Sequence, residues 1–296
     1  MIIFTDARRY IINEQKPAAA WRQVLSTDLQ TNIRGDMNTL SSETLITTVK
    51  EAARLMQADG FEVSYKEGFS NIVTSSDVAV QDFLCARLKE LLPDSGFICE
   101  EEDMRDISHE YTWIIDPIDG TANYSRGIAQ CAICVALKHG DDIELGVVYI
   151  PQTGELFHAE RGKGAWLNGR RISVSQRPFA NSIMCTALPV YHKEYTEVCS
   201  DIIREAFMQC NDIRRFGACA PELCYLAMGR CELYFEYLLS PWDFAAASLI
   251  VTEAGGMITD LDGSTPTCTC QCGIVAANSK ENHTRLLNIV QKKIKG

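Results

Sequence analysis

The stretch that decides the fold is Trp113-Ile114-Ile115-Asp116-Pro117-Ile118-Asp119-Gly120-Thr121-Ala122-Asn123. Its first three residues are large and apolar, as is typical of a buried strand, and two carboxylates follow three positions apart. Pro117 fixes one backbone angle, and Gly120 permits a turn and the close approach of other atoms. We therefore predict a strand that delivers Asp116 and Asp119 onto a turn.

Two carboxylates at a strand end are candidate ligands of a hard divalent cation. Mg²⁺ prefers carboxylate and carbonyl oxygens and keeps several waters, so Asp116, Asp119 and the carbonyl of Ile118 could hold such ions. The amides of Gly120 and Thr121, at the start of a predicted short helix, could bind an anion. Metal ions beside an anion pocket indicate a phosphate ester, although an ordinary acidic turn has the same short pattern.

Two other acidic segments have simple explanations when each is taken alone. Residues 97–102 end an apolar strand with carboxylates that include Glu100, and such a run is typical of a solvated face. Asp243 follows Pro241 and Trp242 at the predicted start of a helix, where helix capping is its simplest role. Only the combination of these segments with the Asp116–Asp119 stretch favours a catalytic site.

Outward from this stretch, hydrophobic periodicity predicts alternating helices and short strands. Helices are expected from residue 41 to a stop at 59–60, and at 77–92, 193–208, 220–228, 244–254 and 279–295. Strands are expected at 112–116, 131–137, 144–150, 155–159, 171–174, 182–188, 231–237, 257–259 and 273–277. This order lacks a strict βαβ rhythm, so it predicts a layered α/β or α+β fold and not a Rossmann fold.

The length of 296 residues allows one large domain or two fused halves. Residues 1–36 lack a periodic pattern, and we expect them to lie outside the catalytic fold. A soft boundary near 176–178 divides the rest into a metal-binding α+β half, 37–178, and an α/β half, 179–296, that completes the active site.

Charge and hydropathy exclude several classes of protein. The chain has 28 basic and 39 acidic residues, a net charge of −11, which argues against a nucleic-acid binder that relies on a basic face. No apolar run approaches the ~20 residues of a membrane span, and charged residues follow too soon after Met1 for a signal peptide. We therefore expect a cytoplasmic protein that keeps its thirteen cysteines reduced.

Two cysteine spacings deserve comparison with metal sites. Cys131 and Cys134 fall in a predicted strand, where alternation places their thiols on opposite faces. Cys268, Cys270 and Cys272 have a period of two, which predicts one shared strand face. Both sets are interpreted as structural thiols, and the role of the second set is left open.

In combination, the acidic segments resemble the inositol monophosphatase family over roughly residues 41–292. The matching segments are Glu100-Glu101 after an apolar pair, residues 116–123, residues 71–77, Trp242-Asp243 followed by Glu253-Ala254-Gly255-Gly256, and Gly162-Lys163-Gly164-Ala165 with Asn168-Gly169. The resemblance implies an αβαβα sandwich of the sugar-phosphatase type. It also implies Mg²⁺-dependent hydrolysis of a phosphate monoester, with two or three Mg²⁺ ions and inhibition by Li⁺.

The same resemblance implies roles for the metal-binding and catalytic residues. Glu100, Asp116 and the carbonyl of Ile118 would hold the ion that activates water, and Glu100 would also hold a weaker third ion. Asp116, Asp119 and Asp243 would hold the ion that stabilises the leaving group. Thr121, hydrogen-bonded towards Asp77, would orient and deprotonate the attacking water.

Substrate contacts are implied in the same way. The family's pattern assigns substrate-binding positions to Glu100, Ile118, Asp119, Gly120, Thr121, Gly217, Ala218, Cys219, Glu236 and Asp243. Among these, Glu236 aligns with a carboxylate that accepts hydrogen bonds from inositol hydroxyls, and its alternative reading is an edge-strand charge. Lys66 has the spacing of a family lysine near the metal ions, and it is almost equally well explained as a surface lysine.

The chain departs from the family's pattern at several positions, none of them a proposed metal ligand. Cys99 replaces a glycine before the glutamate pair, Asn71 stands where aspartate is common, and Ala218 lacks the usual hydroxyl. Pro221-Glu222 alters the start of the following helix, and residues 102–111 form a short, highly charged loop. These departures concern the choice of substrate and not the type of reaction.

The expected substrate is myo-inositol 1-phosphate or a related polyol phosphate. Fructose 1,6-bisphosphate and a 3′(2′),5′-bisphosphate nucleotide are alternatives within the same superfamily, and a relative that binds metal without turnover is the non-enzymatic alternative. Haloacid dehalogenase phosphatases have one residue between their two carboxylates, whereas two residues separate Asp116 from Asp119. This spacing argues against that class of phosphatase. The expected partners are a small phosphate ester and a second copy in a homodimer, with no nucleic acid and no membrane.

Overall fold

The computed structural model describes residues 41–56, 60–66, 72–101 and 105–295. The chain divides into two units, Met1–Arg34 and Gly35–Gly296, and every described residue belongs to the second. The expected extension, 1–36, therefore lies outside the described residues, as does Asn71.

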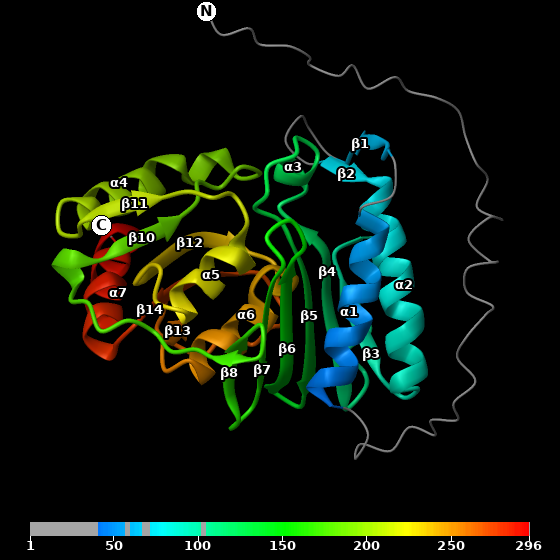
Figure 1. The fold of residues 1–296 in the computed structure, drawn as a ribbon. Helices are drawn as coiled ribbons and strands as arrows, with labels where there is room; N and C mark the ends of the chain where they lie inside the picture. The colour runs from blue at the N-terminus through cyan, green and yellow to red at the C-terminus, as the bar shows by residue number, and fades with distance from the viewer. Residues whose placement is uncertain (1–40, 57–59, 67–71, 102–104, 296) are drawn as a thin grey trace, which may run out of the picture. The chain divides into compact units, whose positions relative to one another are not determined.

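Two mixed sheets form the frame of this unit (Figure 1). The seven-stranded sheet runs in chain order through β3 Gly96–Cys99, β4 Tyr111–Asp119, β5 Ala132–His139, β6 Asp142–Ile150, β7 Glu155–Glu160, β8 Gly164–Leu167 and β9 Arg170–Arg171. It is antiparallel except for the β3–β4 pair. A separate small ribbon pairs β1 Val63–Tyr65 with β2 Ile72–Thr74.

The five-stranded sheet has a non-sequential order, β11-β10-β12-β14-β13. Its strands are β10 Ile183–Thr186, β11 Asp212–Arg214, β12 Leu233–Leu239, β13 Met257–Thr259 and β14 Cys272–Ala277. Strand β10 pairs in parallel with both β11 and β12, whereas β14 pairs antiparallel with β12 and β13.

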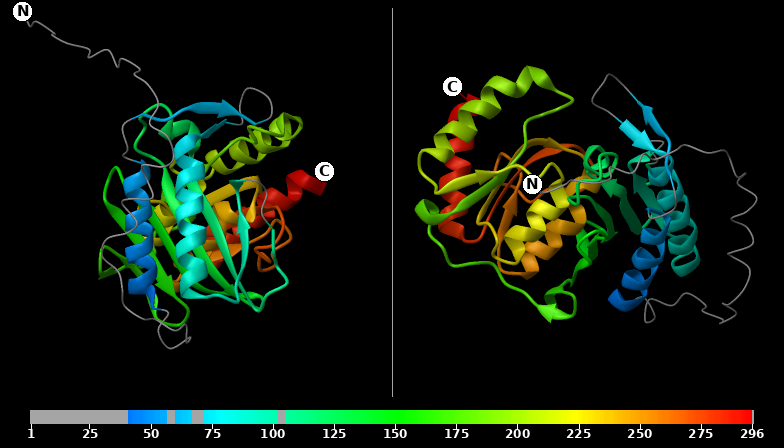
Figure 2. Two further views of the ribbon diagram at one scale, coloured as in Figure 1. Left: turned by 90° about the vertical axis from the view of Figure 1, so that its right-hand side faces the viewer. Right: turned by 45° about the horizontal axis from the view of Figure 1, so that its top comes forward.

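Helices fill three layers around these sheets. They are α1 Ser42–Met56, α2 Ser75–Leu91, α3 Thr121–Tyr124, α4 Thr196–Phe207, α5 Cys219–Ala227, α6 Pro241–Glu253 and α7 Lys280–Lys295, with 3₁₀ turns at Phe179–Asn181 and Lys193–Tyr195. Helices α1 and α2 lie side by side on one face of the large sheet (Figure 2). Helices α5 and α6 pack between the sheets, and α4 and α7 cover the outer face of the small sheet. The expected αβαβα sandwich is confirmed.

Side-chain alternation along the central strands explains this layering. In β5, Ala132, Cys134 and Ala136 pack in the cluster around α5 and α6, whereas the intervening Ile133 and Val135 pack against α1 and α2. Small residues face the middle layer, so its helices can approach the sheet closely. Cys131 and Cys134 fall into different clusters, as the strand pattern predicted.

Most predicted elements are present with ends shifted by a few residues, but residues 171–174 are a correction. The strand there is limited to Arg170–Arg171. The Ile172 amide still donates to the carbonyl of Ala165 in β8 at 2.9 Å, but the backbone then leaves the sheet, and the Val174 amide donates to the carbonyl of Ala254 at 3.1 Å. Ile172 and Val174 are apolar because they pack in the middle layer and not because they alternate in a strand.

The second cysteine set is also a correction. Strand β14 begins only at Cys272, and Cys268 has a left-handed backbone with φ of 55°. A left-handed residue breaks an extended run, so a period of two does not place the three thiols on one face. Cys268 is buried, Cys270 is exposed and Cys272 is half-buried.

None of the described helices is both long enough and apolar enough to cross a membrane. All thirteen cysteines lie among the described residues, and all are free thiols.

We predict that a variant beginning at Met37 keeps the melting temperature and the catalytic rate of the full chain. Helix α1 starts only at Ser42, so removal of 1–36 leaves its buried face intact. A variant beginning at Lys50 is the matched control, because it removes the buried Leu45 and Val49 and should unfold at a lower temperature. Lost solubility or a lower melting temperature in the Met37 variant would contradict the prediction.

Candidate active site

A β-bulge at the end of β4 turns two carboxylates towards the same side. Asp116 pairs with Cys134 and Asp119 with Ala132, so three steps along β4 match two steps along β5. Both partners face the middle layer, and the bulge therefore brings Asp116 and Asp119 to that layer together. The sequence predicted a turn here, whereas the strand continues through the bulge to Asp119. The Ile118 amide donates to Asp116 Oδ1 at 2.9 Å and holds the bulge.

Gly120 ends the strand in a conformation that suits glycine. Its φ is 88°, and a Cβ there would lie 2.9 Å from the carbonyl oxygen of Gln130 and 3.0 Å from Ala218 Cβ. The chain then enters the short helix α3 at Thr121. Thr121 Oγ1 lies 3.1 Å from Asp77 Oδ1 and 3.1 Å from the carbonyl oxygen of Ile118, so its single proton can be donated to either.

Helix α2 contributes the partner of Thr121. Asp77 is fully buried in the first turn, and its Oδ2 accepts the Thr74 amide at 2.8 Å in a capping box. Four residues further along the same helix face, the Gln81 side chain forms two hydrogen bonds with the backbone of Glu101, both 2.9 Å. One helix face thus positions Thr121 and the glutamate pair.

The glutamate pair lies close to Lys66. Lys66 Nζ is 2.7 Å from Glu101 Oε1 and 3.5 Å from Glu100 Oε1. Glu101 is buried and makes the shorter contact with the lysine, whereas the Glu100 charge also raises the pKa of Asp116. Lys66 therefore lies at the carboxylate cluster and is not an isolated surface lysine.

Asp243 reaches the cluster from the first turn of α6. Ser240 is the N-cap of this helix and Pro241 its first residue, so Asp243 is the third residue and not the N-cap that the sequence suggested. One of its oxygens accepts the Ser240 amide at 2.7 Å. Capping thus uses Oδ2 and leaves the other oxygen for the cluster.

Burial and mutual repulsion raise the pKa values of these carboxyl groups. Burial raises the pKa of Glu100 to about 7, with the neighbouring Glu101 and Asp77 charges adding to the rise and Lys66 opposing it. Burial raises the pKa of Asp119 to about 7, although the Ala220 and Cys219 amides oppose the rise. The pKa values of Asp116 and Asp243 are raised well above the usual range by burial and by the other charges of the cluster.

This donor set fits a hard divalent cation. It consists only of carboxylate and carbonyl oxygens, and a bound cation would remove the repulsion that raises the pKa values. Within the described part of the chain, no three His, Cys, Asp or Glu side chains already form a ligand cage. Mg²⁺ needs only a few protein oxygens beside its waters, and Glu100, Asp116, Ile118, Asp119 and Asp243 are the residues that would supply them.

Asp119 has a second partner, the N-terminus of α5. Its oxygens accept the amides of Cys219 at 3.2 Å and Ala220 at 2.6 Å. The N-cap residue of α5 is Ala218, which has no side-chain acceptor, so Asp119 satisfies these amides instead. The Cys219 amide, predicted to meet the substrate, is thereby committed to Asp119.

Glu222 holds the loop before α5. Its Oε1 accepts the amides of Phe216 at 2.6 Å and Gly217 at 2.9 Å, and Gly217 has a φ of 83°. The Asn123 side chain donates to the Phe216 carbonyl at 2.8 Å and ties this loop to α3. Gly217 and Ala218 thus lie near the cluster, with the Gly217 amide already bonded.

Glu236 lies on β12 next to the cluster and outside the metal-ligand set. Its Oε2 accepts the Tyr234 hydroxyl at 2.6 Å. Burial raises its pKa to about 7, and the nearby Asp119 charge contributes to that rise. The carboxylate is therefore within the electrostatic reach of Asp119.

Sequence reasoning missed three residues that position this site. Gln81 and Glu222 bond only to backbone groups, and Tyr234 bonds to Glu236. Gln81 had one detectable signal, its place four residues after Asp77 on a helix. Glu222 was noticed only as a departure from the family's pattern.

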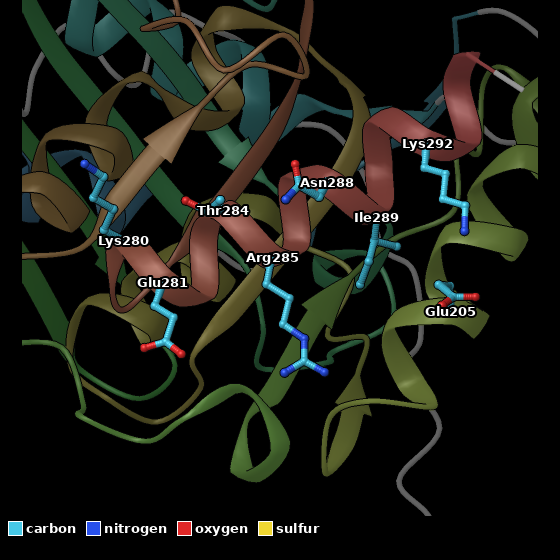
Figure 3. A pocket seen from close by; sticks show the side chains of 8 residues that line it. All are labelled: Glu205, Lys280, Glu281, Thr284, Arg285, Asn288, Ile289 and Lys292. Atoms are coloured by element: carbon cyan, nitrogen blue, oxygen red, sulfur yellow. The ribbon is translucent and has the colours of Figure 1, made fainter.

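A separate hollow of about 740 Å³ lies between α4 and α7 (Figure 3). It is lined by Glu205, Lys280, Glu281, Thr284, Arg285, Asn288, Ile289 and Lys292. Both helices cover the outer face of the small sheet, whereas the carboxylates face the middle layer. The hollow is therefore not part of the carboxylate cluster.

Comparison with known proteins agrees with this geometry. The family model of the inositol monophosphatase family matches residues 33–295. The chain is 35% identical to the Nus factor SuhB of Vibrio cholerae serotype O1 over 243 residues, 81% of this chain and 90% of that protein.

Solved structures share the fold. The extragenic suppressor protein suhB of Bartonella henselae has a TM-score of 0.78 at 32% identity, covering 84% of this chain and 98% of that one. An IMPase of Thermotoga maritima has a TM-score of 0.77 at 28% identity, covering 86% and 97%. The chain belongs to the inositol monophosphatase family.

Proposed function

We propose that the protein hydrolyses a phosphate monoester, with myo-inositol 1-phosphate or a related polyol phosphate as the substrate. The observation that carries the proposal is the convergence of Glu100, Asp116, Asp119 and Asp243 beside the Thr121–Asp77 hydrogen bond. Membership of the inositol monophosphatase family supports the same reaction class.

Four carboxylates alone would repel a phosphate, so the reaction needs a compensating positive charge. Mg²⁺ held here would supply that charge, lower the pKa of a bound water and offset negative charge on the phosphate oxygens. Glu100, Asp116, Ile118, Asp119 and Asp243 are the residues that would hold it. Lys66 adds a fixed cation at 2.7 Å from Glu101 and so limits the repulsion within the glutamate pair.

Thr121 and Asp77 can accept and transfer the proton of the attacking water. Thr121 Oγ1 has lone pairs that can accept a proton while its own proton passes to Asp77 Oδ1, 3.1 Å away. Asp77 is fully buried, and burial raises its pKa, so its carboxylate is a stronger proton acceptor than an exposed aspartate. Thr74 keeps the other oxygen of Asp77 occupied and thereby directs Oδ1 to Thr121.

A non-catalytic function is the second candidate, because curated relatives bear the name Nus factor SuhB. A phosphate-release assay with and without Mg²⁺ separates the two. Release that requires Mg²⁺ supports catalysis, and a substrate panel with fructose 1,6-bisphosphate and adenosine 3′,5′-bisphosphate then tests the alternative substrates. Inhibition by Li⁺, assembly as a homodimer and a cytoplasmic location stay predictions.

We predict that Asp119→Asn lowers turnover by about 10²–10³-fold, the scale of losing one electrostatic contact in the transition state. Asparagine keeps one oxygen to accept an α5 amide but loses the negative charge. Turnover is measured at saturating Mg²⁺, with the exposed Asp82→Asn as the matched control. A folded Asp119→Asn protein with near-normal turnover would contradict the assignment.

The raised pKa values predict a pH-dependent response to Mg²⁺. In metal-free protein, the stability contributed by protonated Glu100 and Asp119 is fully present below their unfolded pKa values and is lost as pH rises through about 7. Mg²⁺ competes with these protons for the carboxylates. The increase in the protein's melting temperature that Mg²⁺ causes should therefore be at least about twice as large at pH 8 as at pH 6.

Thermal unfolding with MgCl₂, compared with NaCl of equal ionic strength, measures this effect. Glu100→Gln should reduce the pH dependence, whereas Glu197→Gln, an exposed change on α4, should leave it intact. Equal Mg²⁺-induced shifts at both pH values would show that these carboxyls do not bind the ion.

We predict that Glu236→Gln reduces kcat/KM for inositol monophosphate by roughly 10–150-fold, because hydrogen bonds to charged groups contribute about 1.5–3 kcal/mol. The smaller 2-glycerophosphate should lose far less, since it offers fewer hydroxyls. Equal losses for both substrates would place Glu236 in metal binding or folding. No loss for either would indicate a different natural substrate.

A further inference from the structure

Two thiols meet directly behind the glutamate pair. Cys85 Sγ and Cys99 Sγ are 3.7 Å apart. Cys85 lies on α2 and is half-buried, whereas Cys99 is the fully buried last residue of β3. Cys99 immediately precedes Glu100, so a change at its sulfur acts one residue away from a proposed metal ligand.

Cys85 belongs to the helix face that organises the site. Asp77, Gln81 and Cys85 follow one another at intervals of four residues on α2, the spacing of one helix face. Their partners are Thr121, the Glu101 backbone and Cys99. The cysteine contact is therefore the third link between α2 and the loop that holds the glutamates.

We propose that Cys85 and Cys99 form a reversible disulfide on exposure to hydrogen peroxide, and that this bond weakens Mg²⁺ binding at the neighbouring cluster. The Cys85 sulfur attacks the peroxide O–O bond and becomes a sulfenic acid, with release of one water. The Cys99 sulfur then attacks the Cys85 sulfur, so the S–S bond forms as the S–O bond breaks and a second water leaves. Two thiols are oxidised and one peroxide is reduced to two waters.

The geometry explains why the bond would disturb the glutamate loop. The sulfurs must approach from 3.7 Å to about 2.05 Å. Cys99 is held in register with Ile115 of β4, and Glu101 is held by Gln81 with two bonds of 2.9 Å. Glu100 lies between these two anchors, and its amide donates to the Ile115 carbonyl at 3.3 Å. Displacement of the Cys99 backbone therefore strains this bond and moves Glu100.

Other cysteines are less well placed for this reaction. Cys185 and Cys231 also adjoin each other, but both are almost completely buried. Cys270 is exposed, and its sulfur is 3.5 Å from the Thr267 hydroxyl. Among the cysteines, Cys85 and Cys99 combine direct sulfur contact with partial exposure of one partner.

Formation of the bond is tested on the full chain without reference to activity. The protein is treated with one equivalent of hydrogen peroxide, its remaining thiols are alkylated, and its peptides are mapped by mass spectrometry. We expect a cross-linked peptide pair containing Cys85 and Cys99, the loss of two of the thirteen thiols, and reversal by dithiothreitol. Cross-links confined to other cysteines would overturn the proposal.

Matched variants assign the effect to this pair. Cys85→Ser should abolish the cross-link, and Cys85→Ala provides a second test should the serine variant unfold. Cys210→Ser, a change at a half-buried cysteine far along the chain, should leave the cross-link intact. Persistence of the same mass shift in both Cys85 variants would overturn the assignment.

The effect on Mg²⁺ rests on the proposed function and is measured separately. Oxidation should raise the Mg²⁺ concentration for half-maximal thermal stabilisation by roughly tenfold, the lower end of the change caused by disturbing groups around a metal ligand. Cys85→Ser treated with peroxide should show no change. A cross-linked protein with unaltered Mg²⁺ dependence would overturn the coupling, whereas a protein that never responds to Mg²⁺ would overturn the proposed function instead.

Discussion

Negative charge concentrated in a largely buried space is the constraint on which the rest of this structure depends. Glu100 follows the end of β3, Asp116 and Asp119 lie in β4, and Asp243 lies in α6. The charges of Glu100 and Asp119 raise the pKa values of both Asp116 and Asp243. Such a group is costly unless protons or cations compensate it. The fold therefore needs strong local contacts to hold these carboxylates together, and a cation to make their grouping useful.

Backbone groups provide much of that local support. The Ile118 amide holds Asp116, the Ser240 amide holds Asp243, and the α5 N-terminus holds Asp119. One oxygen of Asp116 and one of Asp243 accept an amide hydrogen, whereas both oxygens of Asp119 do so. Each carboxylate is thus oriented by a regular element. The helix N-termini contribute partial positive charge as well, so the same bonds orient the groups and reduce their repulsion.

Helix α2 contacts the carboxylate cluster, the proposed catalytic threonine and the pair of thiols. One face holds Thr121 through Asp77, the glutamate loop through Gln81, and the end of β3 through the Cys85–Cys99 contact. These three links share one helix face. This arrangement is the physical basis of the proposed link between thiol oxidation and Mg²⁺ binding.

The sequence by itself determined the layers and the residues with ionisable chemistry. Apolar periodicity located α1, because the burial of one face leaves a regular pattern in the chain. Continuous apolar runs bounded by turn residues located α6 and the long strands, which are buried on nearly all sides. Tertiary structure decided what local pattern could not show. The β4 bulge depends on pairing with β5, the capping of α5 by Asp119 joins residues a hundred positions apart, and the Cys85–Cys99 contact requires α2 to pack on β3. Each of these depends on contact between distant segments, and so no short stretch of sequence carries its signal.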